Sequence, residues 1–187
     1  MKKIIFVPGF IGGRRDMWLL KVILKKFELI YFPYKTNLEE PIEKIANKLK
    51  NFINGLKLNK GEKVSIIGLS AGGIIVEYYL KFLDNKKIDK FISLYSPFKG
   101  TYLAYIYSLF LKRKGLQQLK SNSIFLNELA KKKLNNIKVK NIWCWLDPLV
   151  PGTSAKGINP KHTYFFLHWF VQYWPPIILE IKKFLNK

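Results

Sequence analysis

Short apolar runs alternate along the chain with longer segments in which apolar residues recur every three or four positions. The short runs are typical of buried strands, and the longer segments are typical of amphipathic helices. Because helices cover both faces of a parallel sheet, this alternation predicts an α/β fold with helices on both faces and a mostly parallel central sheet of about six strands. The predicted strands span residues 3–7, 28–32, 63–67, 89–94, 137–146 and 162–167, and the predicted helices span residues 42–53, 74–83 and 177–185.

Two helix starts carry residues that favour an N-cap. Asp16 follows a glycine-rich loop and precedes an apolar segment, so it is predicted to cap a helix that runs to about residue 26. Asn37 and Glu40 resemble a capping box ahead of the helix at 42–53. Both features predict where helices begin after the first two strands.

The alternation of strands and helices breaks between residues 101 and 133. We interpret this stretch as a short helical insertion, a lid or cap on a single domain of residues 1–187, because a chain of this length has room for one well-packed core. It carries an apolar and aromatic patch at 102–111, which the basic run 112–114 follows. The patch fits a core, since aromatic side chains bury large areas, and it also fits a lipid interface.

The formal net charge of +21 comes from 33 Lys and Arg against 12 Asp and Glu. A charge of this size favours anionic partners such as acidic lipid headgroups or nucleic acid. The chain has no nucleic-acid-binding motif, so nucleic acid is not expected, whereas peripheral contact with an anionic membrane surface is. The lysines are also spread along the chain among many Asn and Ile residues, a distribution that compositional bias alone would produce.

One cysteine and two histidines restrict disulfide and metal chemistry. Cys144 has no cysteine partner, and its apolar neighbours predict that it packs in the core. No group of carboxylates accompanies these three residues in sequence, so we expect neither a metal nor another cofactor.

Two apolar stretches are too short for an export signal or a membrane span. The first, at residues 4–7, is about half as long as a secretory signal requires and runs into Pro8. The second, at residues 164–179, contains His168 and two prolines and is shorter than a membrane span. We therefore expect no transmembrane helix, and a cytoplasmic protein that is peripheral to the membrane where it meets lipid.

The stretch Gly68-Leu69-Ser70-Ala71-Gly72 carries the strongest chemical signal in the sequence. It follows a predicted strand and precedes a predicted helix, which is the context of a nucleophile elbow. A serine hydroxyl is a weak nucleophile, so it must project from a sharp turn where a base can take its proton. Gly68 and Gly72 fit such a turn, because a side chain at either position would crowd it.

Three segments of the chain together resemble the α/β-hydrolase superfamily, and within it the small microbial triacylglycerol lipases and esterases. Two further segments are similar to a loop and an insertion segment of these lipases. The main matches are Val7-Pro8-Gly9-Phe10 with Gly12-Gly13 for the oxyanion loop, residues 68–72 for the elbow and residues 146–151 for the acid loop; the weaker matches are residues 96–101 and 123–129.

The chain departs from this resemblance at two positions. Pro8 stands where many relatives have His, and Leu167 stands where many have Gly before the catalytic His.

The glycine loop is not a phosphate-binding loop, because no Gly-Lys-Ser or Gly-Lys-Thr follows it.

The remaining triad members follow from the rule that sites in α/β sheets lie at the carboxyl ends of strands. His168 follows its strand, whereas His162 begins the same strand and would lie about 16 Å away. Asp147 follows its strand, whereas the acids at 84 and 89 lie at the opposite end of the sheet. Asp147 would hold the tautomer of His168, and Ser70, Asp147 and His168 have the chain order of this fold. In the alternative interpretation Asp147 merely starts a turn and His168 packs at a helix start.

Backbone N–H groups would stabilise the oxyanion that forms during acyl transfer. The residue after the nucleophile, Ala71, and Phe10 of the glycine loop are predicted to supply them, because Pro8 has no N–H. The residues that we expect to contact an apolar substrate are Ile11, Leu69, Tyr102, Leu149 and Trp169.

These features predict a lipase or esterase that acts on a lipid or small-molecule ester. A thioesterase, acyltransferase or amidase would use the same residues, because a triad says little about the leaving group. A non-catalytic hydrolase-like protein that binds anionic membranes is the alternative outside the enzymes.

Overall fold

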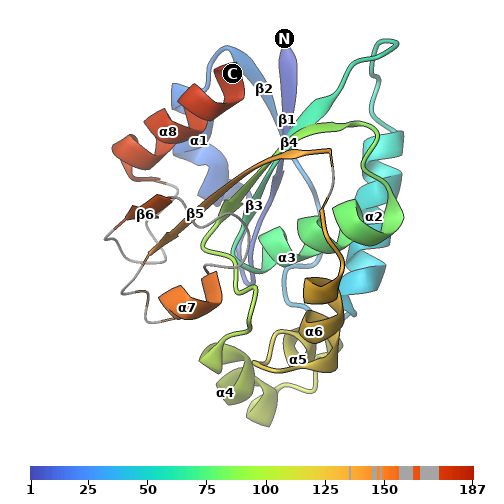
Figure 1. Ribbon diagram of the computed structural model, residues 1–187, viewed down its shortest axis with the longest axis vertical. Helices are drawn as coiled ribbons and strands as arrows, with labels where there is room; N and C mark the ends of the chain where they lie inside the picture. Colours follow the sequence, from blue (N-terminus) through green and yellow to red (C-terminus); the bar gives the residue numbers. More distant parts are fainter. Residues whose placement is uncertain (135, 145–146, 148, 156–161, 165–172) are drawn as a thin grey trace.

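The computed structural model describes residues 1–134, 136–144, 147, 149–155, 162–164 and 173–187. Its centre is a six-stranded sheet with the order β2-β1-β3-β4-β5-β6, and every neighbouring pair is parallel (Figure 1). The predicted α/β fold is confirmed, and each predicted strand corresponds to an observed one. The strands are β1 (Lys2–Val7), β2 (Phe27–Tyr31), β3 (Val64–Leu69), β4 (Ile88–Leu94), β5 (Lys138–Cys144) and β6 (His162–Tyr164).

Helices cover both faces of the sheet, as Figure 1 shows. Side chains alternate along β1, so Ile4 and Phe6 pack in one core with α1 and α8, while Ile5 and Val7 pack in the other with α2 and α3. Strands that are buried on both faces explain the unbroken apolar runs in the sequence. The helices on these faces are α1 (Trp18–Ile23), α2 (Ile42–Asn54), α3 (Ala71–Tyr78) and α8 (Pro175–Asn186), with the 3-10 helix η1 (Arg14–Met17) before α1 and the π-helix η2 (Tyr79–Leu83) after α3.

The stretch at 101–133 forms three short helices, which confirms the predicted helical insertion. Two of them begin at capping side chains: the Thr101 hydroxyl accepts from the Leu103 N–H at 3.3 Å, and the Ser123 hydroxyl accepts from the Leu126 N–H at 3.2 Å. The helices are α4 (Tyr102–Phe110), α5 (Lys114–Gln118) and α6 (Ile124–Lys131), and α7 (Gly152–Ala155) lies between β5 and β6. Among the described residues, no helix is long and apolar enough to cross a membrane.

Both predicted caps were wrong. Asp16 lies inside η1, and its carboxylate accepts from the N–H of Gly13, the residue that precedes this helix, at 2.8 Å. Asn37 accepts from the N–H of Glu39, two residues along, and α2 begins only after Pro41. The first free N–H of α2 instead donates at 2.7 Å to Gln118 in the insertion, a partner that local sequence could not reveal.

A buried ion pair joins the elbow helix to the insertion. The Lys81 ammonium donates to the Glu77 carboxylate at 2.5 Å and to the Leu129 carbonyl at 2.8 Å, and both charged side chains are almost fully buried. Burial raises the pKa of the Glu77 carboxyl, while Lys81 opposes that rise. The pair therefore depends on both partners, since either charge alone would be buried without compensation.

We expect Lys81→Met to lower the free energy of unfolding by about 3–5 kcal/mol, because Glu77 would keep a buried charge with no cation beside it. Lys131→Met is the matched control: Lys131 contacts Glu128 at the same distance, 2.5 Å, but both side chains are exposed. An exposed pair of this kind contributes at most about 1 kcal/mol. Urea unfolding of the two variants measures the difference, and equal losses would contradict this role of the buried pair.

Candidate active site

Ser70 lies on a strained turn between β3 and α3. Its backbone has φ 50° and ψ −123°, a conformation that a residue with a side chain rarely adopts and that costs about 1–3 kcal/mol. Hydrogen bonds on both sides fix the turn: the Ser70 N–H donates to the Leu94 carbonyl at 2.8 Å, and the Gly73 N–H donates to the Ser70 carbonyl at 2.9 Å. The geometry is that of a nucleophile elbow, as the sequence predicts.

The glycines around Ser70 allow the elbow to touch its neighbours. A Cβ on Gly68 would lie 2.6 Å from the Gly73 Cα, and a Cβ on Gly72 would lie 2.2 Å from the Val7 carbonyl oxygen. A Cβ on Gly9 would lie 2.9 Å from the Ser70 Cβ. The loop after β1 and the elbow are therefore in direct contact, and any larger residue at these positions would separate them.

The glycine loop leaves the Phe10 N–H, beside the elbow, without a bond to any residue that the structure describes. The N–H of Ile11 donates to Thr36, that of Gly12 to Gly9 and that of Gly13 to Asp16. The N–H groups of Phe10 and Ala71 make no hydrogen bond with any described residue. These are the two donors that the sequence predicts for an oxyanion.

The predicted acid lies in a loop after β5. Asp147 is 6% exposed, and its Oδ1 accepts from the N–H groups of Leu149 at 2.8 Å and Val150 at 3.0 Å. The Thr101 hydroxyl, at the start of the insertion, donates to the Leu149 carbonyl. The loop is thus held by its own carboxylate and by the segment that leads into α4.

Of the two histidines, His162 lies among the described residues. The strand β6 pairs with β5 so that His162 stands opposite Ile142, five residues before Asp147. Since β6 is parallel to β5, it runs toward the edge of the sheet at which Ser70 lies. His168 and Trp169 lie outside the described residues.

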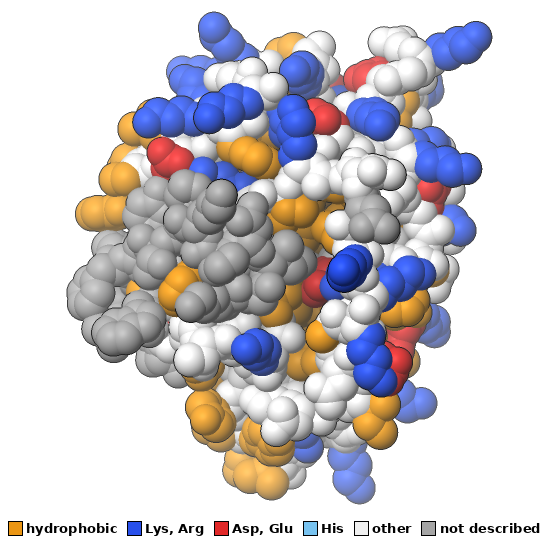
Figure 2. All heavy atoms as spheres, in the orientation of Figure 1, with side chains coloured by type: hydrophobic (Ala, Val, Ile, Leu, Met, Phe, Trp, Pro, Cys, Tyr) orange, Lys and Arg blue, Asp and Glu red, His pale blue; other side chains and the backbone are white. Residues whose placement is uncertain are grey.

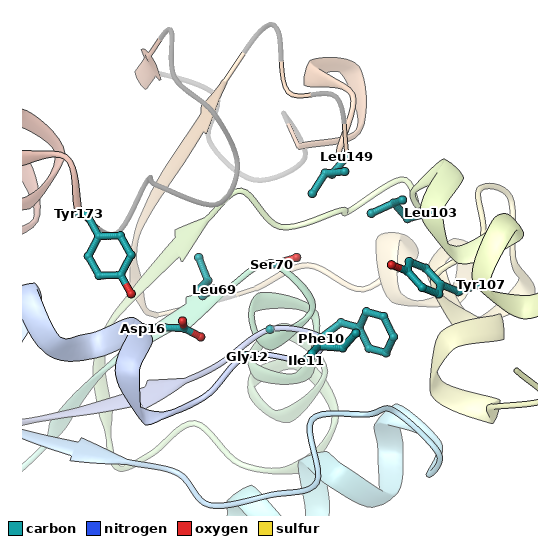
Figure 3. A pocket seen from close by; sticks show the side chains of 11 residues that line it. Phe10, Ile11, Gly12, Asp16, Leu69, Ser70, Leu103, Tyr107, Leu149 and Tyr173 are labelled. Atoms are coloured by element: carbon teal, nitrogen blue, oxygen red, sulfur yellow. The ribbon is translucent and has the colours of Figure 1, made fainter.

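A cavity of about 360 Å³ opens at Ser70 (Figure 3). Its lining includes Ile11, Leu69 and Leu149, three of the residues predicted to contact substrate. It does not include Tyr102, whose side chain is 67% exposed elsewhere on α4. The complete lining among the described residues is Gly9, Phe10, Ile11, Gly12, Asp16, Leu69, Ser70, Leu103, Tyr107, Leu149 and Tyr173.

Leu103 and Tyr107 of α4 line the cavity in place of Tyr102. The Tyr107 ring meets the Phe10 ring edge to face, with centroids 5.3 Å apart. The insertion is therefore in contact with the loop that carries one of the two free N–H groups. The spacing of Leu103 and Tyr107, four residues apart, is the only sequence signal that could have identified them.

Asp16 also lines the cavity, which sequence reasoning missed because it assigned this residue to a helix cap. Partial burial raises the pKa of the Asp16 carboxyl, and its hydrogen bond from the Gly13 N–H acts in the opposite direction. The side chain thus fixes the glycine loop at the edge of the cavity. No group of three or more His, Cys, Asp or Glu that could hold a metal ion is found in the described part of the chain.

A protein-family model of palmitoyl protein thioesterases matches residues 25–148, more than half of the chain. The matched range runs from just before β2 to the acid loop and contains both Ser70 and Asp147. The chain belongs to the palmitoyl protein thioesterase family. Membership of a thioesterase family supports a hydrolase that acts on lipid acyl groups. No curated protein sequence matches this chain.

Solved structures share the α/β-hydrolase fold of this thioesterase-family chain. A Listeria innocua gene product is 15% identical with a TM-score of 0.73, over 100% of this chain and 94% of the other. The mature Bacillus licheniformis lipase BlEst2 is 15% identical with a TM-score of 0.70, over 99% and 91%. The Legionella pneumophila phospholipase PlaB is 16% identical with a TM-score of 0.66, over 77% of this chain but only 39% of that enzyme. At these identities the likeness concerns the fold.

Proposed function

We propose that this protein is a serine hydrolase that cleaves carboxylic esters of lipids or other apolar acyl groups through Ser70, Asp147 and His168. The strained backbone of Ser70 carries the proposal. A serine held at positive φ between a strand and a helix costs free energy that a structural turn would avoid, and such strain clusters at functional sites. The cavity at Ser70 and the N–H groups of Phe10 and Ala71, which bond to no described residue, support the same conclusion.

In the proposed reaction the Ser70 oxygen attacks the acyl carbon while His168 takes the hydroxyl proton. The N–H groups of Phe10 and Ala71 stabilise the negative charge on the carbonyl oxygen. The bond to the leaving group then breaks, and His168 returns the proton to it. Water attacks the acyl-enzyme in the same way, which releases the acid and restores Ser70. Asp147 keeps His168 in the tautomer that accepts the proton and stabilises the imidazolium.

The strand register supports His168 over His162 as the base. The backbone of His162 pairs with Ile142, five residues before Asp147 in the sequence, so His162 starts its strand away from the carboxyl edge. Ser70 and Asp147 come after the carboxyl ends of β3 and β5, and in the sequence residue 168 likewise comes after β6. A base at 168 is therefore the arrangement consistent with the observed strand direction.

A thioester is the second candidate substrate, and the family match favours it. The triad accepts either leaving group, because both reactions proceed through the same acyl-enzyme. The apolar side chains of Phe10, Leu69, Leu103 and Leu149 in the cavity suit the acyl part of either substrate.

The proposed function predicts turnover of p-nitrophenyl esters from acetate to palmitate, with a preference for an acyl chain longer than acetate. Parallel assays with acyl thioesters of the same chain lengths compare the two leaving groups. Faster cleavage of the esters identifies an esterase or lipase, and faster cleavage of the thioesters identifies a thioesterase. Absence of turnover on every member of both series, with folded protein, would refute the proposed reaction.

The helix α4 is the proposed contact with an anionic membrane surface. Its last two residues, Leu109 and Phe110, are 80% and 81% exposed, although Leu103 and Tyr107 on the same helix line the cavity. Figure 2 shows apolar side chains gathered at the end of the molecule that α4 occupies. The basic run 112–114 follows at once, so acidic headgroups would meet cations beside the inserted side chains.

We expect Leu109→Gln with Phe110→Gln to weaken sedimentation with phosphatidylglycerol vesicles by about tenfold or more, because two large apolar side chains no longer enter the lipid. Hydrolysis of a soluble short-chain ester should stay unchanged, since neither side chain lines the cavity. Leu179→Gln, at an exposed apolar position on α8, is the control and should bind vesicles like the wild type. Equal binding by the α4 double variant and this control would contradict the docking role.

A further inference from the structure

A second hollow lies beside the cavity at Ser70. It measures about 720 Å³, and the described residues that line it come from η1, α1 and the start of the C-terminal segment. Tyr173, which Figure 3 shows at the cavity of Ser70, lines both hollows. Its hydroxyl donates to the Arg15 carbonyl at 3.1 Å. The two hollows are therefore neighbours with a shared wall, so that one ligand could occupy both. The lining residues are Arg14, Arg15, Met17, Trp18, Lys21 and Tyr173.

Arg14, Arg15 and Lys21 are exposed, and among the described residues no carboxylate forms an ion pair with any of these three cations of the hollow. Only 3 of the 33 basic residues of the chain are arginines, and two of these three are adjacent here. A guanidinium binds a phosphate through two parallel hydrogen bonds, which an ammonium cannot do. The choice of arginine at these two positions therefore indicates a phosphate more than a general surface charge.

The hollow combines these cations with aromatic side chains. The Arg14 guanidinium lies over the Tyr31 ring, 5.4 Å from its centroid, and this contact restricts its orientation. Trp18 is 64% exposed next to the buried Met17, so the floor of the hollow offers apolar contact as well as charge. A surface of this composition suits an organic phosphate better than a hydrated inorganic ion, because the organic part can cover the exposed ring.

We propose that this hollow binds a phosphate group on the leaving group of the substrate while the acyl chain occupies the cavity at Ser70. The proposal rests on the proposed hydrolase function and specifies its substrate class as acyl esters or thioesters whose alcohol or thiol carries a phosphate. Two sources share this chemistry, a lysophospholipid and a phosphate-bearing thiol carrier. The contact raises affinity for the substrate and takes no part in bond cleavage.

Matched pairs of octanoyl substrates, used below their micelle concentration, test the proposal. In the ester pair, octanoylglycerol phosphate is compared with octanoylglycerol; in the thioester pair, octanoyl-CoA is compared with octanoyl N-acetylcysteamine. We expect the phosphorylated member of at least one pair to have a kcat/KM about tenfold or more above its neutral partner, mainly through KM. The pair that shows the preference identifies the source of the phosphate.

Arg14→Gln with Arg15→Gln should reduce this preference to near unity and leave turnover of the neutral substrates unchanged. Lys57→Gln with Lys60→Gln is the control, because it removes the same charge from exposed positions between α2 and β3, at the opposite end of the sheet. The control should keep the preference. Equal kcat/KM within both pairs, or a preference that survives the arginine double variant, would overturn the proposal.

The test of the phosphate site can fail without the test of the hydrolase activity failing, and the reverse also holds. Turnover without a phosphate preference refutes the second site and leaves the hydrolase intact. If no substrate is cleaved, titration calorimetry of octanoyl-CoA and octanoylglycerol phosphate against Ser70→Ala still tests the hollow. We expect Ser70→Ala to bind at least one of these two phosphorylated compounds. Adding Arg14→Gln and Arg15→Gln to Ser70→Ala should weaken this binding by about tenfold or more. Equal affinity with and without the arginine changes would overturn the proposal.

Discussion

Ser70→Ala lowers kcat/KM for acyl esters by about 10⁶-fold, to the level that oxyanion stabilisation and binding alone supply. The alanine has no hydroxyl to form the acyl-enzyme, while it keeps the Cβ that contacts the glycine loop. Its backbone must adopt the same positive φ, so the fold and its strain stay as they are. Steady-state hydrolysis of p-nitrophenyl esters measures the loss.

Ser65→Ala is the control for this result. Ser65 lies near the amino end of β3, the strand that leads to the turn at Ser70, and it does not line the cavity. We expect it to retain wild-type activity. Activity of Ser70→Ala close to that of this control would show that another residue performs the chemistry.

Asp147→Asn gives the second largest effect, a loss of about 10⁴-fold in kcat, because an amide cannot hold the histidine in the required tautomer or stabilise the imidazolium. The asparagine Oδ1 can still accept from the N–H groups of Leu149 and Val150, so the loop keeps its shape. Substrate affinity should therefore change little, and the loss should appear in kcat.

Asp84→Asn is a matched control for the acid. The Asp84 Oδ1 also accepts from a backbone N–H two residues along, that of Lys86 at 3.0 Å, but Asp84 precedes β4 at the opposite end of the sheet. This variant should retain full kcat. A loss in Asp147→Asn no larger than in Asp84→Asn would assign Asp147 a structural turn and nothing more.

The strands and the elbow could be predicted because their signals are local. A strand that is buried on both faces appears as an apolar run, and Gly68, Ser70 and Gly72 fit a turn that admits no larger side chain beside it. The strand order then brings Ser70 and the acid loop to one edge, because parallel strands all end at the same side. The topology thus supports the proposed roles of Ser70 and Asp147 at this edge.

The caps and the α4 contacts could not be predicted because they depend on distant or ambiguous partners. The first N–H of α2 bonds to Gln118, which is 76 residues away. The helix α4 is apolar around most of its circumference, so its sequence has no polar face that would show which side meets the cavity. For this reason the sequence predicts Tyr102 as a substrate contact, whereas Leu103 and Tyr107 are the α4 residues that line the cavity. Asp16 was predicted as the N-cap itself, whereas it is the third residue of η1 and its carboxylate accepts from the N–H of Gly13, three residues earlier.

Labelling with an alkyl fluorophosphonate, followed by peptide mapping, tests the central claim most directly. The reagent bonds to a serine whose hydroxyl is activated and whose neighbouring N–H groups donate hydrogen bonds to the oxygen of the tetrahedral adduct. We predict one adduct per chain, on the peptide that contains Ser70, and no adduct on Ser70→Ala. A folded protein that forms no adduct, or one whose adduct lies on another residue, would contradict the assignment of Ser70 as the nucleophile.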